Sequence, residues 1–189
     1  MPTRRLLLRT LAPLVPLLVL PGCGTLLGPD EVLIPRAQLE EALARQLPQH
    51  FSAGLFELDA RLGRLQLLPQ DNRVAVEVGF DTSGPLMPQV YTGRFDLVFG
   101  VRYEPSDRSL RATQLQARAF ELPGAPAGLA SGLERALPVI ARILVGDDLV
   151  LHRLSASQGE RLARIGRRPD QIRVTPEGLL VKLVADGTS

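Results

Sequence analysis

Four long stretches in which apolar side chains recur at every second residue constrain the fold more than any other feature of the chain. In residues 74–81, Val74, Val76, Val78 and Phe80 alternate with small or polar neighbours. This is the spacing of a β-strand that buries one face. The other three stretches are residues 56–67, 91–103 and 110–122. Because short turns make neighbouring strands antiparallel, the sequence predicts a four-strand antiparallel meander.

Irregularities within these stretches predict that the sheet is strongly curved. In the first stretch the apolar alternation changes phase at Gly63 and Arg64, which is the pattern of a β-bulge. Further glycines lie inside the other stretches, at Gly79, Gly93 and Gly100. Long strands with bulges and glycines curl readily, so we expect a curved sheet.

Three segments have the spacing of amphipathic helices. The first covers residues 35–48 and carries leucines four residues apart. The longest covers residues 127–145, and its second half is apolar almost all round, which predicts that the helix is largely buried. Pro138 lies inside it and predicts a bend. The third helix is expected at residues 158–165.

Shorter strands complete the expected fold. They are predicted at residues 31–34 and 149–154 and on both sides of the turn at residues 176–178. The pattern indicates an α+β domain over residues 31–185, with residues 186–189 as a tail. We expect one long, strongly curved antiparallel sheet, the meander plus the C-terminal strands, wrapped around the long apolar helix, with two shorter helices.

The N-terminal segment has the three parts of a bacterial export signal. Three arginines within its first nine residues precede an apolar run at residues 11–20, which is too short to span a membrane. The residues Leu20-Pro21-Gly22-Cys23 then resemble a lipobox, the cleavage and lipidation site of bacterial lipoproteins. We therefore predict a signal peptide at residues 1–22 and lipid attachment at Cys23. The alternative is cleavage elsewhere, with Cys23 an ordinary residue.

Lipidation determines where the protein is expected. Residues 23–30 would form a short lipidated tether, and two or more acyl chains on Cys23 hold a protein stably at a bilayer. In the lipoprotein sorting system that the lipobox implies, an aspartate after the cysteine signals retention in the inner membrane. Gly24 follows here, so we expect the outer membrane, facing the periplasm.

The overall charge of +2 does not describe the processed chain. Three of the 22 basic residues lie in the signal peptide, which has no acidic residue, so 19 basic and 20 acidic residues remain, a net charge of −1. A nucleic-acid partner requires a basic surface that displaces counterions from phosphates, and we exclude that class of partner.

No constellation of catalytic or metal-binding residues is visible. The two histidines, His50 in an expected loop and His152 in an expected strand, have no second ligand at a suitable spacing. The pair Asp147 and Asp148 is interpreted as a solvated helix end rather than a cation site. The sequence has no nucleophile elbow and no phosphate-binding loop. We predict no cofactor, no metal and no enzymatic activity.

Several segments together resemble the YceB-like envelope lipoproteins. Besides the lipobox they are Ile34-Pro35-Arg36-Ala37-Gln38-Leu39, the Leu137-Pro138 helix, Ser157-Gln158-Gly159-Glu160 and Ile172-Arg173-Val174-Thr175-Pro176-Glu177-Gly178. That family is known mainly as a domain of uncharacterised function. Its fold is similar to one half of the tubular lipid-binding modules, a long helix in a curved antiparallel sheet. The resemblance implies a lipid or another hydrophobic ligand.

We therefore expect an apolar groove between the sheet and the long helix, occupied by an acyl-chain ligand. The residues expected along it are Val76, Val78, Phe80, Phe95, Leu97, Phe99, Leu137, Ile140 and Leu144. Two alternatives remain open: these residues form an ordinary filled core, or the protein is an accessory lipoprotein that docks on an envelope assembly complex without a ligand.

Overall fold

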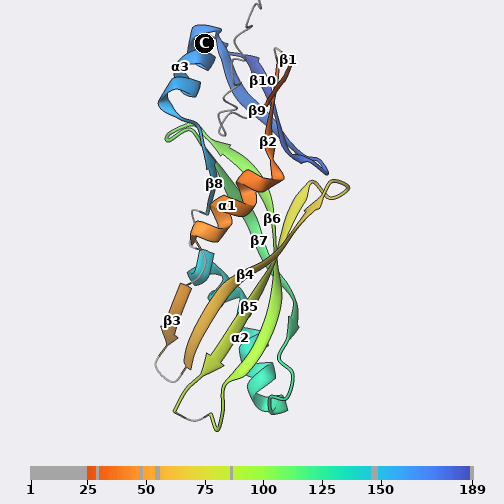
Figure 1. Ribbon diagram of the computed structural model, residues 1–189, viewed down its shortest axis with the longest axis vertical. Coiled ribbons are helices and arrows are strands. Elements are labelled where there is room, and N and C mark those ends of the chain that lie inside the picture. The colour runs from red at the N-terminus through yellow and green to blue at the C-terminus, as the bar shows by residue number, and fades with distance from the viewer. Residues whose placement is uncertain are drawn as a thin grey trace, which may run out of the picture.

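The computed structural model describes residues 25–28, 30–46, 49–53, 56–85, 87–145 and 149–187. These residues form three helices and two antiparallel sheets (Figure 1). In chain order the elements are β1 (Thr25–Gly28), β2 (Glu31–Pro35), α1 (Arg36–Gln46), β3 (Gln49–Ala53), β4 (Phe56–Leu68), β5 (Arg73–Ser83), β6 (Tyr91–Glu104), β7 (Ser109–Glu121), α2 (Ala127–Val145), β8 (Val150–Arg153), α3 (Ala156–Arg164), β9 (Arg167–Val174) and β10 (Gly178–Ala185).

The predicted four-strand meander is confirmed as β4, β5, β6 and β7. They form the centre of a six-stranded sheet in the order β3-β4-β5-β6-β7-β8. Val76 of β5 lies opposite Leu65 of β4 and Leu97 of β6, so the alternating apolar residues of neighbouring strands share one face. β3 lies at the edge, where the sequence predicted a loop around His50.

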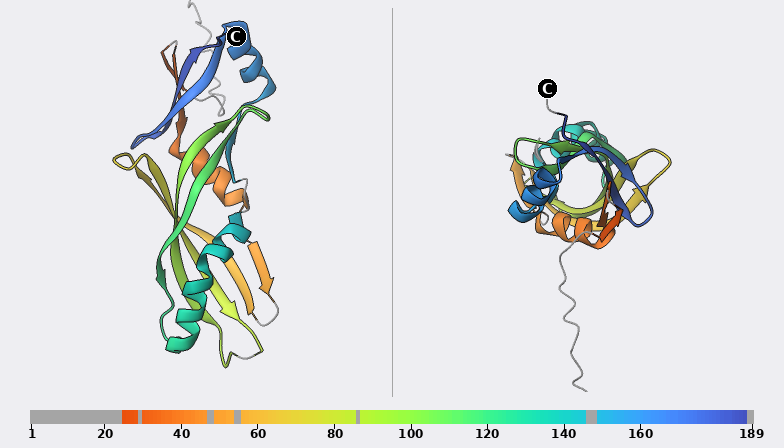
Figure 2. Two further views of the ribbon diagram at one scale, coloured as in Figure 1. Left: turned by 180° about the vertical axis from the view of Figure 1, so that it is seen from behind. Right: turned by 90° about the horizontal axis from the view of Figure 1, so that it is seen from above.

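Bulges and close contacts curl this sheet into a half-barrel (Figure 2). The predicted bulge at Gly63 and Arg64 is confirmed by a shift in the pairing of β4 with β5 between Leu62 and Leu65. β7 carries two non-glycine residues with left-handed backbone, Gln114 and Ala119, along its irregular pairing with β6. Such irregularities bend a strand and increase its twist.

One glycine of the sheet is required by packing. A Cβ on Gly93 would lie 2.5 Å from the Phe80 ring and 2.7 Å from the Glu121 carbonyl oxygen. Any side chain there would force β6 away from its neighbours, so glycine at this position allows the sheet to curl tightly.

Of the predicted C-terminal strands, β8 extends the meander beside β7, but β9 and β10 do not, contrary to the expectation of a single sheet. The edge of β7 is already paired with β8, and α3 intervenes before β9. The β9–β10 hairpin, which the sequence predicted, pairs instead with β2 in a second sheet of order β1-β2-β10-β9. β1 lies within residues 23–30, the segment predicted to be a tether.

The helix α2 has the predicted bounds but is less buried than its sequence suggests. It buries one side through Leu133, Leu137 and Ile140. Val139 and Ile143, which the sequence also predicted to be buried, are 60% and 48% exposed. The sheet therefore covers one side of α2 and leaves an apolar side open.

The two sheets lie toward opposite ends of an elongated molecule (Figure 1). β1, β2, β9, β10 and α3 are at one end, whereas α2, β3 and the far ends of β4 and β5 are at the other. Buried residues of both sheets still belong to one core. The Asn72 side chain also links the β4–β5 turn to β9, because it donates to the Ile172 carbonyl oxygen (3.2 Å) and accepts from the Val174 amide (2.7 Å).

Candidate functional site

The residues predicted to line a groove are packed together in the interior. Eight of the nine are at most 7% exposed, and all eight belong to the same core: Val76, Val78, Phe80, Phe95, Leu97, Phe99, Leu137 and Ile140. The ninth, Leu144, has a side chain outside the described residues. Most of the predicted set therefore fills a core, and only Ile140 also lines an open pocket.

That pocket lies between α2 and the strands β3, β4 and β5, with a volume of about 390 Å³. Its size falls in the range of small-molecule sites, about 300–1,000 Å³. Its walls are almost entirely apolar. The lining residues are Phe51, Leu58, Thr82, Gly128, Leu129, Gly132, Leu133, Ala136, Val139, Ile140 and Ile143.

The helix contributes most of this lining, and two glycines make room for it. Gly128 and Gly132 lie one turn apart, and a Cβ built on either would meet no atom within 4 Å. Val139 and Ile143 continue the same wall and are partly open to solvent. The pocket is therefore a space along α2 that side chains of the chain itself leave unfilled.

Thr82 is the one polar side chain of the lining. It is completely buried, and among the described residues its hydroxyl has no hydrogen-bond partner. A buried polar group without a partner costs about 1–3 kcal/mol. The site thus includes a locally unfavourable group that stability alone does not explain.

Two other hollows are larger, and both have charged residues in their lining. One, of about 630 Å³, lies between α2 and β7, and its lining includes Arg102 and Arg142. The other, of about 550 Å³, lies between α1 and β8 and includes His152, whose pKa is lowered by burial. Neither brings together an acid, a base and a nucleophile, so the apolar pocket is the stronger candidate site.

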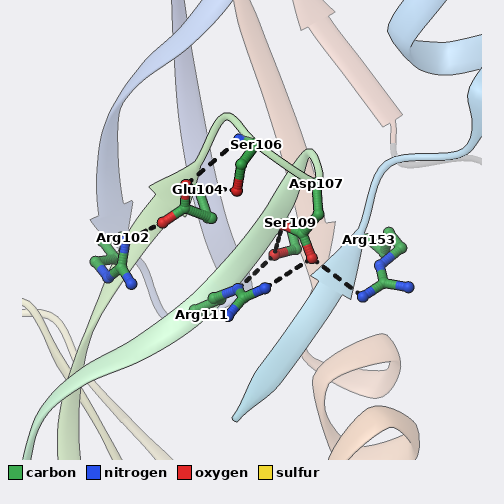
Figure 3. A network of polar contacts seen from close by, with 7 residues as sticks. All are labelled: Arg102, Glu104, Ser106, Asp107, Ser109, Arg111 and Arg153. Carbon is green, nitrogen blue, oxygen red and sulfur yellow. Dashed lines mark hydrogen bonds and ion pairs between the residues drawn. The ribbon is translucent and has the colours of Figure 1, made fainter. Parts of the chain in front are cut away.

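A dense polar network lies at the β6–β7 turn and has the side-chain types of a catalytic centre (Figure 3). Asp107 accepts hydrogen bonds from Ser109 (2.6 Å), Arg111 (2.8 Å) and Arg153 (3.1 Å). The Ser109 hydroxyl, and then Arg111, lower the pKa of Asp107 to about 2. A permanently ionised, fully bonded carboxylate neither takes up nor releases a proton near neutral pH, so this network stabilises the turn.

The remaining sequence predictions have different outcomes. Cys23, Asp147 and Asp148 lie outside the described residues. His50 lies on β3, where the Asp59 carboxylate bonds its Nδ1 at 2.7 Å and raises its pKa. In the part of the chain that the structure describes, no cluster of three or more metal-ligating side chains occurs. Within the same residues no helix is sufficiently long and apolar to cross a membrane.

Compared with protein-family models and with curated proteins, the chain matches none of them. The YceB-like resemblance therefore remains a prediction that rests on the segments quoted above. Of the pocket residues on α2, the sequence predicted only Ile140 along the groove, and the others were missed because their apolar positions also fit a buried core. The spacing of Gly128 and Gly132, four residues apart on one helix face, is the sequence signal that could have identified a face without side chains.

Proposed function

We propose that this protein is a lipid-anchored envelope protein that holds a hydrophobic ligand, an acyl chain, in the pocket beside α2. The observation that supports the proposal best is an apolar lining that the chain leaves open, with Val139 and Ile143 partly exposed along it. Exposed apolar patches in folded proteins mark binding sites or interfaces. In this proposal the curled sheet wraps the buried side of α2, and the ligand covers its open side.

The energetics favour a hydrocarbon ligand. Each methylene moved from water into the pocket contributes about 0.8 kcal/mol, and the lining offers no charged group to compete for it. The lining contains no acid or base, and its one hydroxyl, on Thr82, has no partner among the described residues that could activate it, so the proposed role is binding or carriage rather than catalysis.

The anchor is the second part of the proposal. The arginines, the apolar run and the lipobox support acylation of Cys23, with the outer membrane, facing the periplasm, as the location. We expect Cys23→Ala to shift the protein from the membrane fraction toward the soluble fraction or to block its processing. A variant that is processed and remains membrane-bound like the parent would contradict this part.

Ligand binding is tested by filling the pocket. In Gly132→Leu the new Cβ enters open space, so we expect the fold to accept the leucine and the helix to gain propensity. We expect the parent chain to bind a fluorescent fatty acid saturably and to retain lipid in native mass spectrometry. Because the new leucine displaces about two methylenes of ligand, affinity should fall roughly tenfold.

Ser131→Leu is the matched control, since Ser131 is the exposed neighbour of Gly132 and does not line the pocket. It should leave binding unchanged. If the parent chain binds no fatty acid and co-purifies with no lipid, ligand binding is excluded. Equal loss in the two variants would place the ligand elsewhere.

One observation favours a ligand-free accessory lipoprotein instead. The eight predicted groove residues are closely packed, as a closed core requires. On this alternative, the open side of α2 contacts an envelope protein. Crosslinking in cells from a photoreactive residue at Val139 distinguishes the two: a single dominant protein adduct supports docking, and lipid adducts support carriage.

A further inference from the structure

The corner between α3 and β9 combines exposed positive charge with an exposed apolar side chain. We define the basic corner as Arg161 and Arg164 of α3, Ile165 at its C-terminal cap, and Arg168 of β9. All four are exposed, and Ile165 is 59% exposed. Arg161, Arg164 and Ile165 are related by spacings of three and four residues, so they share one side of the helix end.

The arginines of this corner have few charged or hydrogen-bonding partners among the described residues. Among the described residues, neither Arg161 nor Arg164 forms an ion pair or a side-chain hydrogen bond. Arg168 has only a long contact with Asp186, at 3.8 Å. Charges without a partner in the fold are free to bind an anionic surface.

Backbone hydrogen bonds hold the apolar residue in place. The Ile165 amide donates to the Arg161 carbonyl oxygen at 3.1 Å. Gly166, which has left-handed backbone, accepts from the Asp186 amide at 2.7 Å and donates to the Ala163 carbonyl oxygen at 3.0 Å. Ile165 is therefore presented to solvent by a defined turn that ties α3 to the end of β10.

The basic corner lies beside the segment that leads to Cys23. Arg167, two residues after Ile165, forms an ion pair with Asp30 in the β1–β2 connection, with 2.7 Å between the nitrogen and the carboxylate oxygen. Asp30 follows Cys23 by seven residues, which span at most about 25 Å. A lipid anchor on Cys23 would therefore keep this corner close to the bilayer. In contrast, α2, which lines the pocket, lies at the other end of the molecule (Figure 1).

We propose that the basic corner docks on the headgroups of anionic phospholipids and so fixes the orientation of the anchored protein. This inference rests on the anchor part of the proposed function and is independent of the ligand. Arginine near an anionic membrane surface strengthens binding about fivefold per residue, and an apolar residue among such arginines enters the headgroup region. This contact would hold the four-stranded end against the membrane, with the long axis of the molecule pointing away from it. The pocket would then be accessible from the periplasm.

The test places one probe at each end of the full chain. Ile165→Cys and Val90→Cys are labelled with an environment-sensitive fluorophore, and the proteins are incorporated through their own anchor into phosphatidylcholine vesicles with or without phosphatidylglycerol. The positions are matched, because both parent side chains are 59% exposed and Val90 lies in the β5–β6 connection at the pocket end. Acylation blocks the thiol of Cys23, so each variant carries one label.

We expect a lipid-borne quencher to quench the label at position 165 only in vesicles that contain phosphatidylglycerol, and the label at position 90 in neither. Raised salt should weaken the effect. Replacing Arg161, Arg164 and Arg168 by glutamine in the position-165 variant should weaken docking roughly hundredfold and return quenching to the phosphatidylcholine level.

Equal quenching at the two positions, or no dependence on anionic lipid or on the arginines, would overturn the proposal. Failure of the anchor gives a separate result, because the parent chain would then take up label at a free Cys23 thiol. In that case vesicle binding by the unacylated chain decides the matter: loss on substitution of the three arginines supports the basic corner, and insensitivity refutes it.

Discussion

The two ends of the molecule leave opposite kinds of side chain uncovered. At the six-stranded end, the open side of α2 is apolar and includes Val139 and Ile143. At the four-stranded end, the exposed side chains around the α3–β9 turn are mainly arginines. The net charge of −1 over residues 23–189 therefore conceals two ends with different exposed surfaces. In our proposals one end holds a ligand and the other contacts the membrane.

This contrast holds only if the two ends belong to one folding unit, and the largest predicted effects test that. Phe95 in β6 and Leu179 in β10 are both completely buried in the shared core. Truncation of each to alanine should lower the free energy of unfolding by about 3–5 and 2–5 kcal/mol respectively. Denaturant titration followed by circular dichroism should show a single transition in both variants. A biphasic curve in either would show that the ends unfold separately.

Asn72 is the second test, because its side chain joins the two ends. Asn72→Ala leaves two backbone groups of β9 without their partners and places alanine in a left-handed conformation, with φ of 52°. We expect a loss of about 2–4 kcal/mol, of which the unpaired groups account for about 1–3. Asn72→Gly is the control, since glycine removes the same hydrogen bonds without the backbone strain.

The free energy of unfolding of the glycine variant should be about 1 kcal/mol higher than that of the alanine variant. If both variants have the same midpoint denaturant concentration as the parent chain, Asn72 does not couple the two sheets. In that case the shared core alone would hold the ends together.

Local regularity explains how much of the fold was predictable. The strands β4 to β7, the bulge at Gly63 and Arg64, and the bounds of α2 follow from side-chain periods that each segment carries in itself. The pairing of β10 with β2 was not predictable, because it depends on which strand edge is free after β8 has paired with β7. β3 was missed because five residues of mixed polarity carry no clear period.

The candidate site was harder to predict because apolar residues on two sides of a helix have the same composition. Ile140 and Val139 are neighbours in sequence, yet one is in the core and the other is open. Only the packing of the sheet decides which side it covers. The two glycines that leave the pocket unfilled are informative only once the strands facing them are known.

A substitution at Thr82 tests whether the apolar end is optimised for stability. Its expected effect on the free energy of unfolding is smaller than that of the Asn72 variants and of opposite sign. Thr82→Val replaces an unpaired buried hydroxyl with a methyl group of the same shape, so the free energy of unfolding should rise by about 1 kcal/mol. Thr92→Val on the neighbouring strand is the control. The Thr92 hydroxyl bonds Asp81 at 2.7 Å and is the main cause of the lowered pKa of that carboxyl.

The control should therefore be neutral or slightly destabilising, and the pKa of Asp81 should rise in it. Thermal denaturation compares the two variants. A loss of stability in Thr82→Val would mean that the Thr82 hydroxyl has a hydrogen-bond partner in solution. In that case the pocket would contain no unpaired polar group in the absence of a ligand.

The smallest expected effect is on how the free energy of unfolding depends on pH. Both histidines of the chain lie on outer strands of the six-stranded sheet, His50 on β3 and His152 on β8, so this dependence reports on that end of the molecule. Burial lowers the pKa of His152 below 6.5, so between its folded pKa and 6.5 the unfolded state binds more protons. Stability from this residue is therefore complete above pH 6.5 and falls as the pH drops through 6.5 toward the folded pKa.

His50 acts in the opposite direction. The hydrogen bond that protonated His50 donates to the Asp59 carboxylate, followed by the charge of that carboxylate, raises the pKa of His50 above 6.5, so the folded state binds the proton more tightly. That contribution is complete below pH 6.5 and is lost as the pH rises through the folded pKa. Denaturant titrations between pH 5 and 8 should show that His152→Gln reduces the loss of stability on acidification and that His50→Gln increases it. If the free energy of unfolding changes with pH equally in both variants and in the parent, neither imidazole has a different pKa in the folded and unfolded states. The two ends of the molecule would then differ in their exposed side chains but not in their response to pH.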